Sequence, residues 1–269
     1  MKKSIVVSTQ PTKFSALAFK ENLKESIKKV ADLGFDGAEL AVRNPKDLKV
    51  EDVINIIKEN NLEVPAIGTG QAYGEEGLSF SDPDEIIRKT AVERINAQIV
   101  FASHFNAQVI IGLIRGIIKD GADKTEAEKW TIYCLRKCTE FAKEYNIGLT
   151  LEPVNRYEGN FINTLNEGIE FIKRVGASNL GLLVDTFHMN IEEVSIYDSI
   201  IQAKDYITHV HFADSNRWAP GCGHLDFVKI VQTLKKINYQ GYVSAEILPL
   251  PNSDTAARIT AKTLDKIGC

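Results

Sequence analysis

The sequence contains little cysteine and no paired-cysteine motif. Four cysteines occur in 269 residues, and none of them forms a Cys-x-x-Cys pair. Cys134 and Cys138 lie four residues apart on one face of an expected helix, while Cys222 lies in a glycine-containing loop and Cys269 is the last residue. This pattern argues against a disulfide framework and a thiolate zinc site, and it predicts reduced thiols without a shared role.

Long apolar runs and an excess of basic residues are also missing. The apolar run after the two N-terminal lysines covers only residues 5–7, and no run approaches the roughly 18 residues of a membrane-spanning helix. The formal net charge is −4 and the sequence pI is about 5.8, whereas a surface that binds nucleic acid is basic. We therefore expect a cytoplasmic protein that binds a small molecule rather than a membrane or nucleic acid.

Glycine-rich phosphate loops of the forms GxGxxG and GxxxxGK[ST] do not occur, which disfavours an open Rossmann-type sheet. Instead, eight short runs rich in Val, Ile and Leu alternate with longer amphipathic segments, a pattern typical of parallel strands buried on both faces. Eight such units fit one (β/α)₈ barrel, which typically needs about 250 residues. We therefore predict an α/β fold, a single TIM-barrel domain over residues 1–269. The expected strands are Ser4–Val7, Gly37–Val42, Glu63–Gly68, Gln108–Leu113, Gly148–Glu152, Leu180–Asp185, Ile207–Phe212 and Tyr242–Ile247.

Helical periodicity and capping residues predict several of the intervening helices. Apolar residues at helical spacing predict a helix over Ser15–Leu33, and another is expected over Lys124–Tyr145. Asp82 as N-cap and Pro83 at the first helical position predict a third helix, which runs to residue 104. Expected caps of later helices are Asp226, Asn252 and Ser253.

Acidic or histidine side chains occur at the ends of four consecutive expected strands. Each of them alone would fit a helix cap or a hydrogen-bonded core residue, so their coincidence carries the inference. In such barrels the carboxyl ends of the strands form the active-site rim, where clustered carboxylates are costly unless a cation neutralises them. Oxygen-rich ligands favour Mn²⁺, with Mg²⁺ or Co²⁺ as alternatives. The predicted ligands of this one divalent metal are Glu152, Asp185, His211 and Glu246.

Four motifs follow one another in this half of the chain: LEPVNRYE (151–158), DTFHMNIEE (185–193), HVHFADSNR (209–217) and PGCGHLDF (220–227). In order and spacing they resemble the ketose 3-epimerases, the D-tagatose and D-psicose 3-epimerase group within the xylose-isomerase-like barrels. The resemblance implies the four metal ligands named above and a homodimer or homotetramer. It also implies substrate contacts at Glu158, His188 and Arg217.

The segments IGTGQAY (67–73) and WAPGCG (218–223) give a narrower resemblance to the branch that epimerises 5-keto-L-gluconate and D-tagaturonate. Arg43 follows the second expected strand and Arg115 the fourth. Two arginines at a barrel mouth can bind a carboxylate bidentately. We therefore expect Arg43 and Arg115 to contact a sugar acid. If they pair with surface acids instead, a neutral ketose is the alternative substrate.

The expected reaction inverts a hydroxyl-bearing carbon next to a ketone, through an enediolate that the metal stabilises. Inversion needs an acid/base group on each face of the flat intermediate, and we assign Glu152 and Glu246 to these two roles. His209 is expected to lie deeper than His211, and His224 to be a loop residue. An aldose–ketose isomerase, an inosose-dehydratase-like lyase and a non-catalytic sugar-binding barrel remain alternatives. An apurinic endonuclease is disfavoured, because its three-metal site needs more than the five histidines present.

Overall fold

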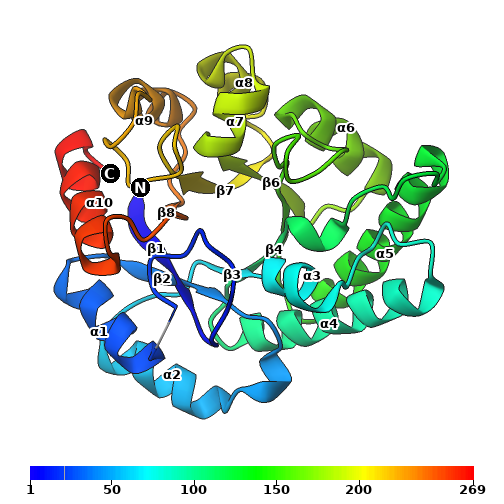
Figure 1. Ribbon diagram of the computed structural model, residues 1–269, viewed down its shortest axis with the longest axis horizontal. Helices are drawn as coiled ribbons and strands as arrows, with labels where there is room; N and C mark the ends of the chain where they lie inside the picture. The colour runs from blue at the N-terminus through cyan, green and yellow to red at the C-terminus, as the bar shows by residue number, and fades with distance from the viewer. Residues whose placement is uncertain (21) are drawn as a thin grey trace.

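The chain folds as a closed barrel of eight parallel strands. A computed structural model describes residues 1–20 and 22–269, and its strands pair in sequence order, with β1 closing onto β8. Figure 1 shows the helices arranged around the strands. The predicted (β/α)₈ barrel is confirmed. The strands are β1 (Lys2–Ser8), β2 (Gly37–Ala41), β3 (Ala66–Gly68), β4 (Gln108–Ile111), β5 (Leu149–Leu151), β6 (Leu180–Asp185), β7 (Ile207–Phe212) and β8 (Tyr242–Ala245).

Helices or short 3-10 turns follow the strands on the outside of the barrel. Two successive α-helices lie between β3 and β4, and two lie between β6 and β7. The 3-10 turns are η1 (Pro45–Asp47) and η2 (Leu113–Arg115). The α-helices are α1 (Leu23–Asp32), α2 (Val50–Glu59), α3 (Gly70–Glu76), α4 (Glu85–Ser103), α5 (Lys124–Glu144), α6 (Leu165–Val175), α7 (Thr186–Glu192), α8 (Ile196–Gln202), α9 (Phe227–Lys236) and α10 (Ser253–Ile267).

Side chains along each strand alternate between the helix layer and the barrel interior. Outward-facing residues such as Leu149 and Leu151 join the large hydrophobic core between strands and helices, where each buried leucine contributes about 1.5–3 kcal/mol. Thr150 lies between these two leucines in the sequence; it is fully buried but is not part of that hydrophobic core. Glu39 and His209 are likewise buried polar residues on strands. The interior of the barrel therefore contains buried polar side chains, whereas the apolar layer between strands and helices supplies most of the hydrophobic stabilisation.

The first expected helix is wrong over its N-terminal part. Helix α1 begins at Leu23, with Asn22 as its N-cap; residue 21, inside the expected helix Ser15–Leu33, lies outside the described residues. Phe19 forms a bridge with Val7 of β1 and is buried. Leu17 packs in a small cluster with Val6 and Ala41. The apolar spacing of this segment serves contacts with the barrel mouth, not a helix.

The remaining helix boundaries largely agree with the predictions, with one shifted cap. Asp84, and not Asp82, caps α4 by accepting a hydrogen bond from the Ile86 N–H at 2.8 Å, so Pro83 precedes the helix. The segment Asp-Pro-Asp offers two possible caps, and Asp82 instead accepts from the Asp84 N–H. Helix α5 and the caps Asp226 and Asn252 are confirmed, whereas Ser253 is the first residue of α10.

The described residues include neither a membrane-spanning helix nor a disulfide. No helix among them is both long and apolar enough to cross a bilayer. Their four cysteines are free thiols, and Cys134 and Cys138 are buried on α5. Burial raises the pKa of the Cys134 thiol to about 12, so this side chain acts as a core residue.

Candidate metal and active site

Four side chains at the carboxyl ends of β5 to β8 converge on one point. Asp185 ends β6 and pairs in register with His211 on β7, while Glu152 and Glu246 directly follow β5 and β8. One ligand atom from each of the four lies within 4.8 Å of all the others. Nδ1 of His211 lies 3.7 Å from Oε1 of Glu152 and 3.7 Å from Oδ2 of Asp185. The structure thus brings the four predicted ligands together.

Three side-chain polar atoms in this cluster are buried without a hydrogen-bond partner: Oε1 of Glu152, Oδ2 of Asp185 and Nδ1 of His211. Each buried acceptor left without a partner costs about 1–3 kcal/mol. Burial, followed by the nearby Glu246 carboxylate, raises the pKa of Glu152 well above its ordinary value. A divalent cation would account for both features, since it would ligate the orphaned atoms and offset the carboxylate charge. Three carboxylates with one imidazole are the donor set of a hard cation such as Mn²⁺ or Mg²⁺.

Glu39 is a site residue that the sequence reasoning missed. It lies on β2, is 1 % exposed, and places its carboxylate within 3.0 Å of His211 Nε2 and 2.8 Å of His209 Nε2. Burial raises the pKa of Glu39, but His211 and His209 outweigh it, so the net shift is downward. The available signal was an acidic residue inside the otherwise apolar run 37–42. His209 indeed lies deeper than His211, in contact with this carboxylate.

His188 lies beside the cluster with a defined orientation. Its Nδ1 accepts a hydrogen bond from the Asn155 backbone N–H at 3.2 Å, so Nε2 carries the proton in the neutral ring. Nε2 lies 3.9 Å from both Glu152 and Asp185. The Asn155 side-chain amide also donates to Glu158 at 2.9 Å. Asn155 therefore links two predicted substrate contacts, a role that its position alone did not indicate.

Arg217 connects both ends of the half-rim formed by β5 to β8. One terminal nitrogen donates to Glu158 at 2.8 Å and the other to Glu246 at 2.7 Å. The guanidinium lies over the rings of Phe14 and Phe187, 5.8 Å and 5.0 Å from their centroids. Its backbone has φ 61°, a strained conformation for a long side chain that clusters at functional sites. The side chain is 12 % exposed, at the open side of the cluster.

The loop after Arg217 is held by a buried carboxylate. Asp214 is fully buried and accepts hydrogen bonds from the backbone N–H groups of Ser215, Gly221 and Leu225. This network fixes the segment that follows β7, which includes the PGCGHLDF motif. His224 in that motif is exposed, in agreement with its expected role as a loop residue.

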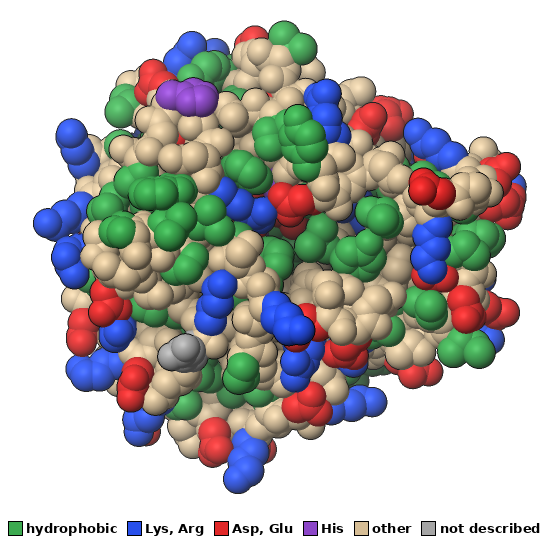
Figure 2. Space-filling view, viewed as in Figure 1, with side chains coloured by type: hydrophobic (Ala, Val, Ile, Leu, Met, Phe, Trp, Pro, Cys, Tyr) green, Lys and Arg blue, Asp and Glu red, His purple; other side chains and the backbone are tan. Residues whose placement is uncertain are grey.

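A cavity opens above the four-residue cluster and has two unlike walls. One wall carries the polar residues already described, from Glu152 to Glu246. The opposite wall is mostly apolar and comes from the first half of the chain. Figure 2 shows acidic and basic side chains next to each other near the centre of this face, with hydrophobic side chains around them. The first-half lining includes Val6, Phe14, Leu17, Ala41, Thr69, Gln71, Ile110 and Leu113.

The two first-half arginines do not occupy the positions expected of a carboxylate clamp. Arg115 is fully buried, donates to the carbonyl oxygens of Gly112, Phe161 and Ile162, and has a pKa lowered by burial to about 10. Arg43 pairs with Glu75 at 3.0 Å, and neither arginine lines the cavity. The expectation that they contact a substrate therefore disagrees with their positions. An arginine after a strand can turn back into the loop layer, which sequence position does not reveal.

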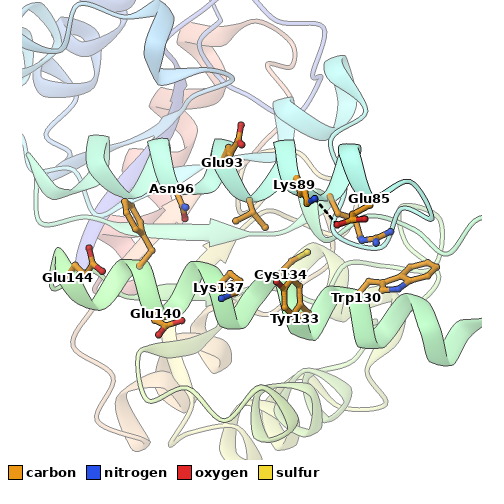
Figure 3. Close-up of a pocket in the computed structure, with 13 residues that line it drawn as sticks. Glu85, Lys89, Glu93, Asn96, Trp130, Tyr133, Cys134, Lys137, Glu140 and Glu144 are labelled. Carbon is orange, nitrogen blue, oxygen red and sulfur yellow. Dashed lines mark ion pairs between the residues drawn. The ribbon is translucent and has the colours of Figure 1, made fainter.

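A larger surface groove lies away from this chemistry, between α4 and α5. Figure 3 shows it lined by residues that include Glu93, Asn96, Trp130 and Tyr133. The groove is on the outer, helical layer, and none of the predicted ligands faces it. Its acids and bases are mainly solvated, as in the Glu85–Lys89 ion pair. We therefore place the chemistry at the strand ends and not in the larger groove.

Comparison with known proteins agrees with the barrel architecture. Residues 27–267 match the model of a family described as "Xylose isomerase-like TIM barrel". The chain is 33 % identical over 231 residues to the D-psicose 3-epimerase of Ruminiclostridium cellulolyticum, covering 83 % of this chain and 77 % of that relative. It is 30 % identical to the 3-dehydro-D-guloside 4-epimerase of Escherichia coli over 246 residues, covering 85 % and 88 %.

A solved structure is similar along almost the whole chain. The crystal structure of the D-psicose 3-epimerase of Clostridium cellulolyticum H10 with D-tagatose superimposes with a TM-score of 0.83. The two sequences are 27 % identical, and the match covers 99 % of this chain and 98 % of that one. The similarity therefore includes the first half of the barrel, where the sequence motifs are weaker.

Proposed function

The chain belongs to the xylose isomerase-like TIM barrel family, and from this premise we propose that it is a metal-dependent sugar epimerase. The proposed reaction inverts a hydroxyl-bearing carbon next to a ketone. The observation that carries the proposal is the convergence of three unpartnered buried polar atoms, on Glu152, Asp185 and His211, with Glu246 within reach. A purely structural cluster of this kind would leave about 1–3 kcal/mol of unmet hydrogen bonding at each atom.

The names of two relatives indicate that each inverts a carbon next to a ketone, although their sugars differ. The D-psicose enzyme is a 3-epimerase of a sugar whose ketone is at carbon 2, and the guloside enzyme is a 4-epimerase of a 3-dehydro sugar. In both cases the inverted carbon is next to the ketone. We infer the same relation for this chain, because a neighbouring ketone is what makes the C–H bond acidic enough to break.

We assign the metal to Glu152, Asp185, His211 and Glu246, with Mn²⁺ favoured and Mg²⁺ or Co²⁺ as alternatives. When bound, the cation supplies positive charge that polarises the ketone and stabilises the negative charge formed on proton loss. Only one imidazole and no thiolate belong to this donor set, which disfavours a zinc site.

Glu152 and Glu246 are proposed as the two acid/base groups. They directly follow β5 and β8, with Asp185 and His211 on the strands between them, so the reacting carbon, which becomes planar on proton loss, can lie between the two carboxylates. One carboxylate removes the proton from one face of the carbon, and the other carboxyl returns a proton to the opposite face. Metal coordination would keep both carboxylates ionised and therefore able to accept a proton. The direction of reaction decides which glutamate is the base.

Glu158, His188 and Arg217 are proposed to position the sugar. His188 presents its Nε2–H towards the cluster, while Arg217 and Asn155 hold Glu158 at 2.8 Å and 2.9 Å. Neighbouring hydroxyl groups of a sugar need both donors and acceptors, which this set provides. Fixed side chains of this kind lower the barrier by holding the reacting carbon between the two glutamates.

The substrate class that the cavity favours is a neutral ketose or keto-glycoside. Among the described residues that line the cavity, Arg217 is the one lysine or arginine, and it already contacts two carboxylates. A sugar acid or phosphate would need a cation that is not yet paired. The apolar wall suits the C–H faces of a neutral sugar. The neutral alternative therefore replaces the keto-hexonate as our proposal.

Other functions fit the cavity less well. A lyase would share the metal and the first proton removal but would expel a hydroxyl group. A nuclease would bind phosphates, and the cavity lacks a free cation for them among its described residues. A non-catalytic sugar-binding barrel would not require two carboxylates on opposite strands. The lyase is the alternative that needs an experiment.

Deuterium exchange tests the proposal. The purified protein with Mn²⁺ is incubated in D₂O with D-psicose, D-tagatose, L-ribulose, a 3-dehydro-D-guloside and D-tagaturonate, and products are analysed by NMR and mass spectrometry. An epimer that carries one deuterium on the inverted carbon supports the proposal, and a chelator should abolish its formation. Loss of water identifies a lyase. Absence of exchange with every sugar overturns the epimerase assignment.

A further inference from the structure

Glu39 contacts the metal-ligand histidine from the side opposite the cluster. Both of its carboxylate oxygens lie 3.0 Å from Nε2 of His211, whereas Nδ1 of the same ring lies 3.7 Å from Glu152 and Asp185. The two nitrogens of one imidazole therefore serve two different sets of acids. All of these groups are buried, so water does not compete for them.

The chemistry of these contacts determines where the His211 proton lies. An ionised carboxylate only accepts hydrogen bonds, so each histidine nitrogen next to Glu39 must donate a proton. His209 Nε2, at 2.8 Å, is the second donor. In neutral His211 the proton is then on Nε2, and Nδ1 is left with a lone pair directed at Glu152 and Asp185.

Glu39 reaches this position across the barrel. It projects from β2, whereas the neighbours of β7 in the sheet are β6 and β8. A shorter acid at position 39 would not span this distance to both histidines.

We propose that Glu39 is a positioning residue that fixes the tautomer of His211 and thereby sets the metal affinity of the site. The part of the inference that concerns metal affinity rests on the proposed function, whereas the part that concerns the His211 tautomer does not. A carboxylate that accepts from the outer nitrogen of a ligand histidine orients the ring and increases its basicity, and losing such a partner typically weakens metal binding about 10–100-fold.

The test compares Mn²⁺ affinity and histidine tautomers in metal-free protein, without any sugar. Glu39→Gln keeps the size of the side chain, but its amide N–H₂ cannot accept from one of the two histidines. We expect Mn²⁺ binding, measured by calorimetric titration, to weaken about 10–100-fold. Thr150→Val is the matched control, because Thr150 is also fully buried on a strand and contacts Thr208 at 3.0 Å, not His211. Its Mn²⁺ affinity should stay within about twofold of wild type.

Histidine ¹H–¹⁵N spectra of the wild-type protein supply a readout that does not depend on a variant folding. At a pH high enough for His211 to be neutral, the expected spectrum shows its proton on Nε2 and a free Nδ1, and Glu39→Gln should change that pattern. A neutral wild-type His211 that carries its proton on Nδ1 overturns the inference. So does an unchanged Mn²⁺ affinity in Glu39→Gln, or an equal loss in Thr150→Val. If the wild type binds no Mn²⁺, the proposed metal site fails, and the spectrum alone then decides the role of Glu39.

Discussion

The backbone of Gly112, after β4, lies directly against the carboxylate of Glu152, after β5. A Cβ atom built on Gly112 would overlap Oε2 of Glu152, so only glycine leaves this carboxylate in place. Gly112→Ala should push Glu152 away from Asp185 and His211. We expect Mn²⁺ affinity to fall at least about tenfold, with a similar loss of kcat/KM, because ligand placement within a fraction of an ångström governs both.

Gly148→Ala is the matched control for this prediction. Gly148 directly precedes β5, whereas Glu152 directly follows it. A Cβ on Gly148 would meet its nearest neighbours at 3.9 Å, an ordinary contact. Titration calorimetry and steady-state kinetics should give values within about twofold of wild type. Equal Mn²⁺ affinity in the two glycine variants would show that Gly112 does not position Glu152.

Glu246→Gln should separate proton removal from inversion. The amide keeps the size of the side chain but cannot act as an acid or base, so epimerisation should fall by about 10²–10⁴-fold. Glu152 remains, and one epimer should therefore still exchange its C–H proton for deuterium without inversion. NMR of single sugars in D₂O measures both processes in one sample.

The control for that variant is Glu170→Gln, which alters an exposed acid on α6 that pairs with Lys173. Its epimerisation and exchange rates should equal those of wild type. Full epimerisation by Glu246→Gln would end the two-base assignment. Loss of exchange from both epimers would instead indicate that Glu246 is needed mainly as a metal ligand.

Arg115→Met should destabilise the protein without changing substrate preference. Arg115 donates to three carbonyl oxygens in the loop layer, and leaving these buried acceptors unpaired should cost about 2–5 kcal/mol. Thermal unfolding should show a Tm lower by roughly 5–10 °C. Neutral and acidic sugars should lose activity equally, whereas a selective loss for D-tagaturonate would restore Arg115 as a substrate contact. Arg43→Met, which breaks a partly exposed pair with Glu75, should change Tm by no more than about 2 °C.

Metal affinity should rise with pH. Burial and Glu246 raise the pKa of Glu152; burial lowers the pKa of His211, but Glu39 and Asp185 outweigh it and raise that pKa well above its ordinary value. Protons therefore occupy these groups at low pH and must leave when a cation binds. Mn²⁺ titrations from about pH 5.5 to about pH 8 should show affinity increasing about tenfold per pH unit for each displaced proton. A flat profile would contradict this competition.

The strand pattern was predictable because it depends on local composition. The limits of β6 and β7 agree with the expected Leu180–Asp185 and Ile207–Phe212. In β6, leucine and valine residues buried on both faces give a continuous apolar run. The helix predicted over residues 15–19 was wrong because that prediction also used only the local spacing of apolar residues. Its apolar residues pack on the barrel mouth, and their spacing happened to match a helix.

Site residues that could be recognised from local sequence were predicted, whereas those that depend on distant partners were not. Strand ends are local features, so Glu152, Asp185, His211 and Glu246 could be proposed from position alone, and the structure places them together. Glu39, Asn155 and Gly112 were missed because each acts through a residue far away in sequence. Arg43 and Arg115 were assigned to the substrate because charge is visible in a sequence, whereas the carboxylate or carbonyl partners that neutralise it are not.

The sequence by itself therefore determined the barrel, the alternation of strands and helices, and which polar groups reach its rim. Tertiary structure decided how those groups are used. Closure of the barrel brings β2 near β7, with only β1 and β8 between them, which gives His211 a third carboxylate, and Arg115 turns inward to carbonyl oxygens. The physical reason is that burial and hydrogen-bond pairing depend on distances between strands that only the closed barrel sets. Those same distances shift the proposed substrate from a sugar acid to a neutral sugar.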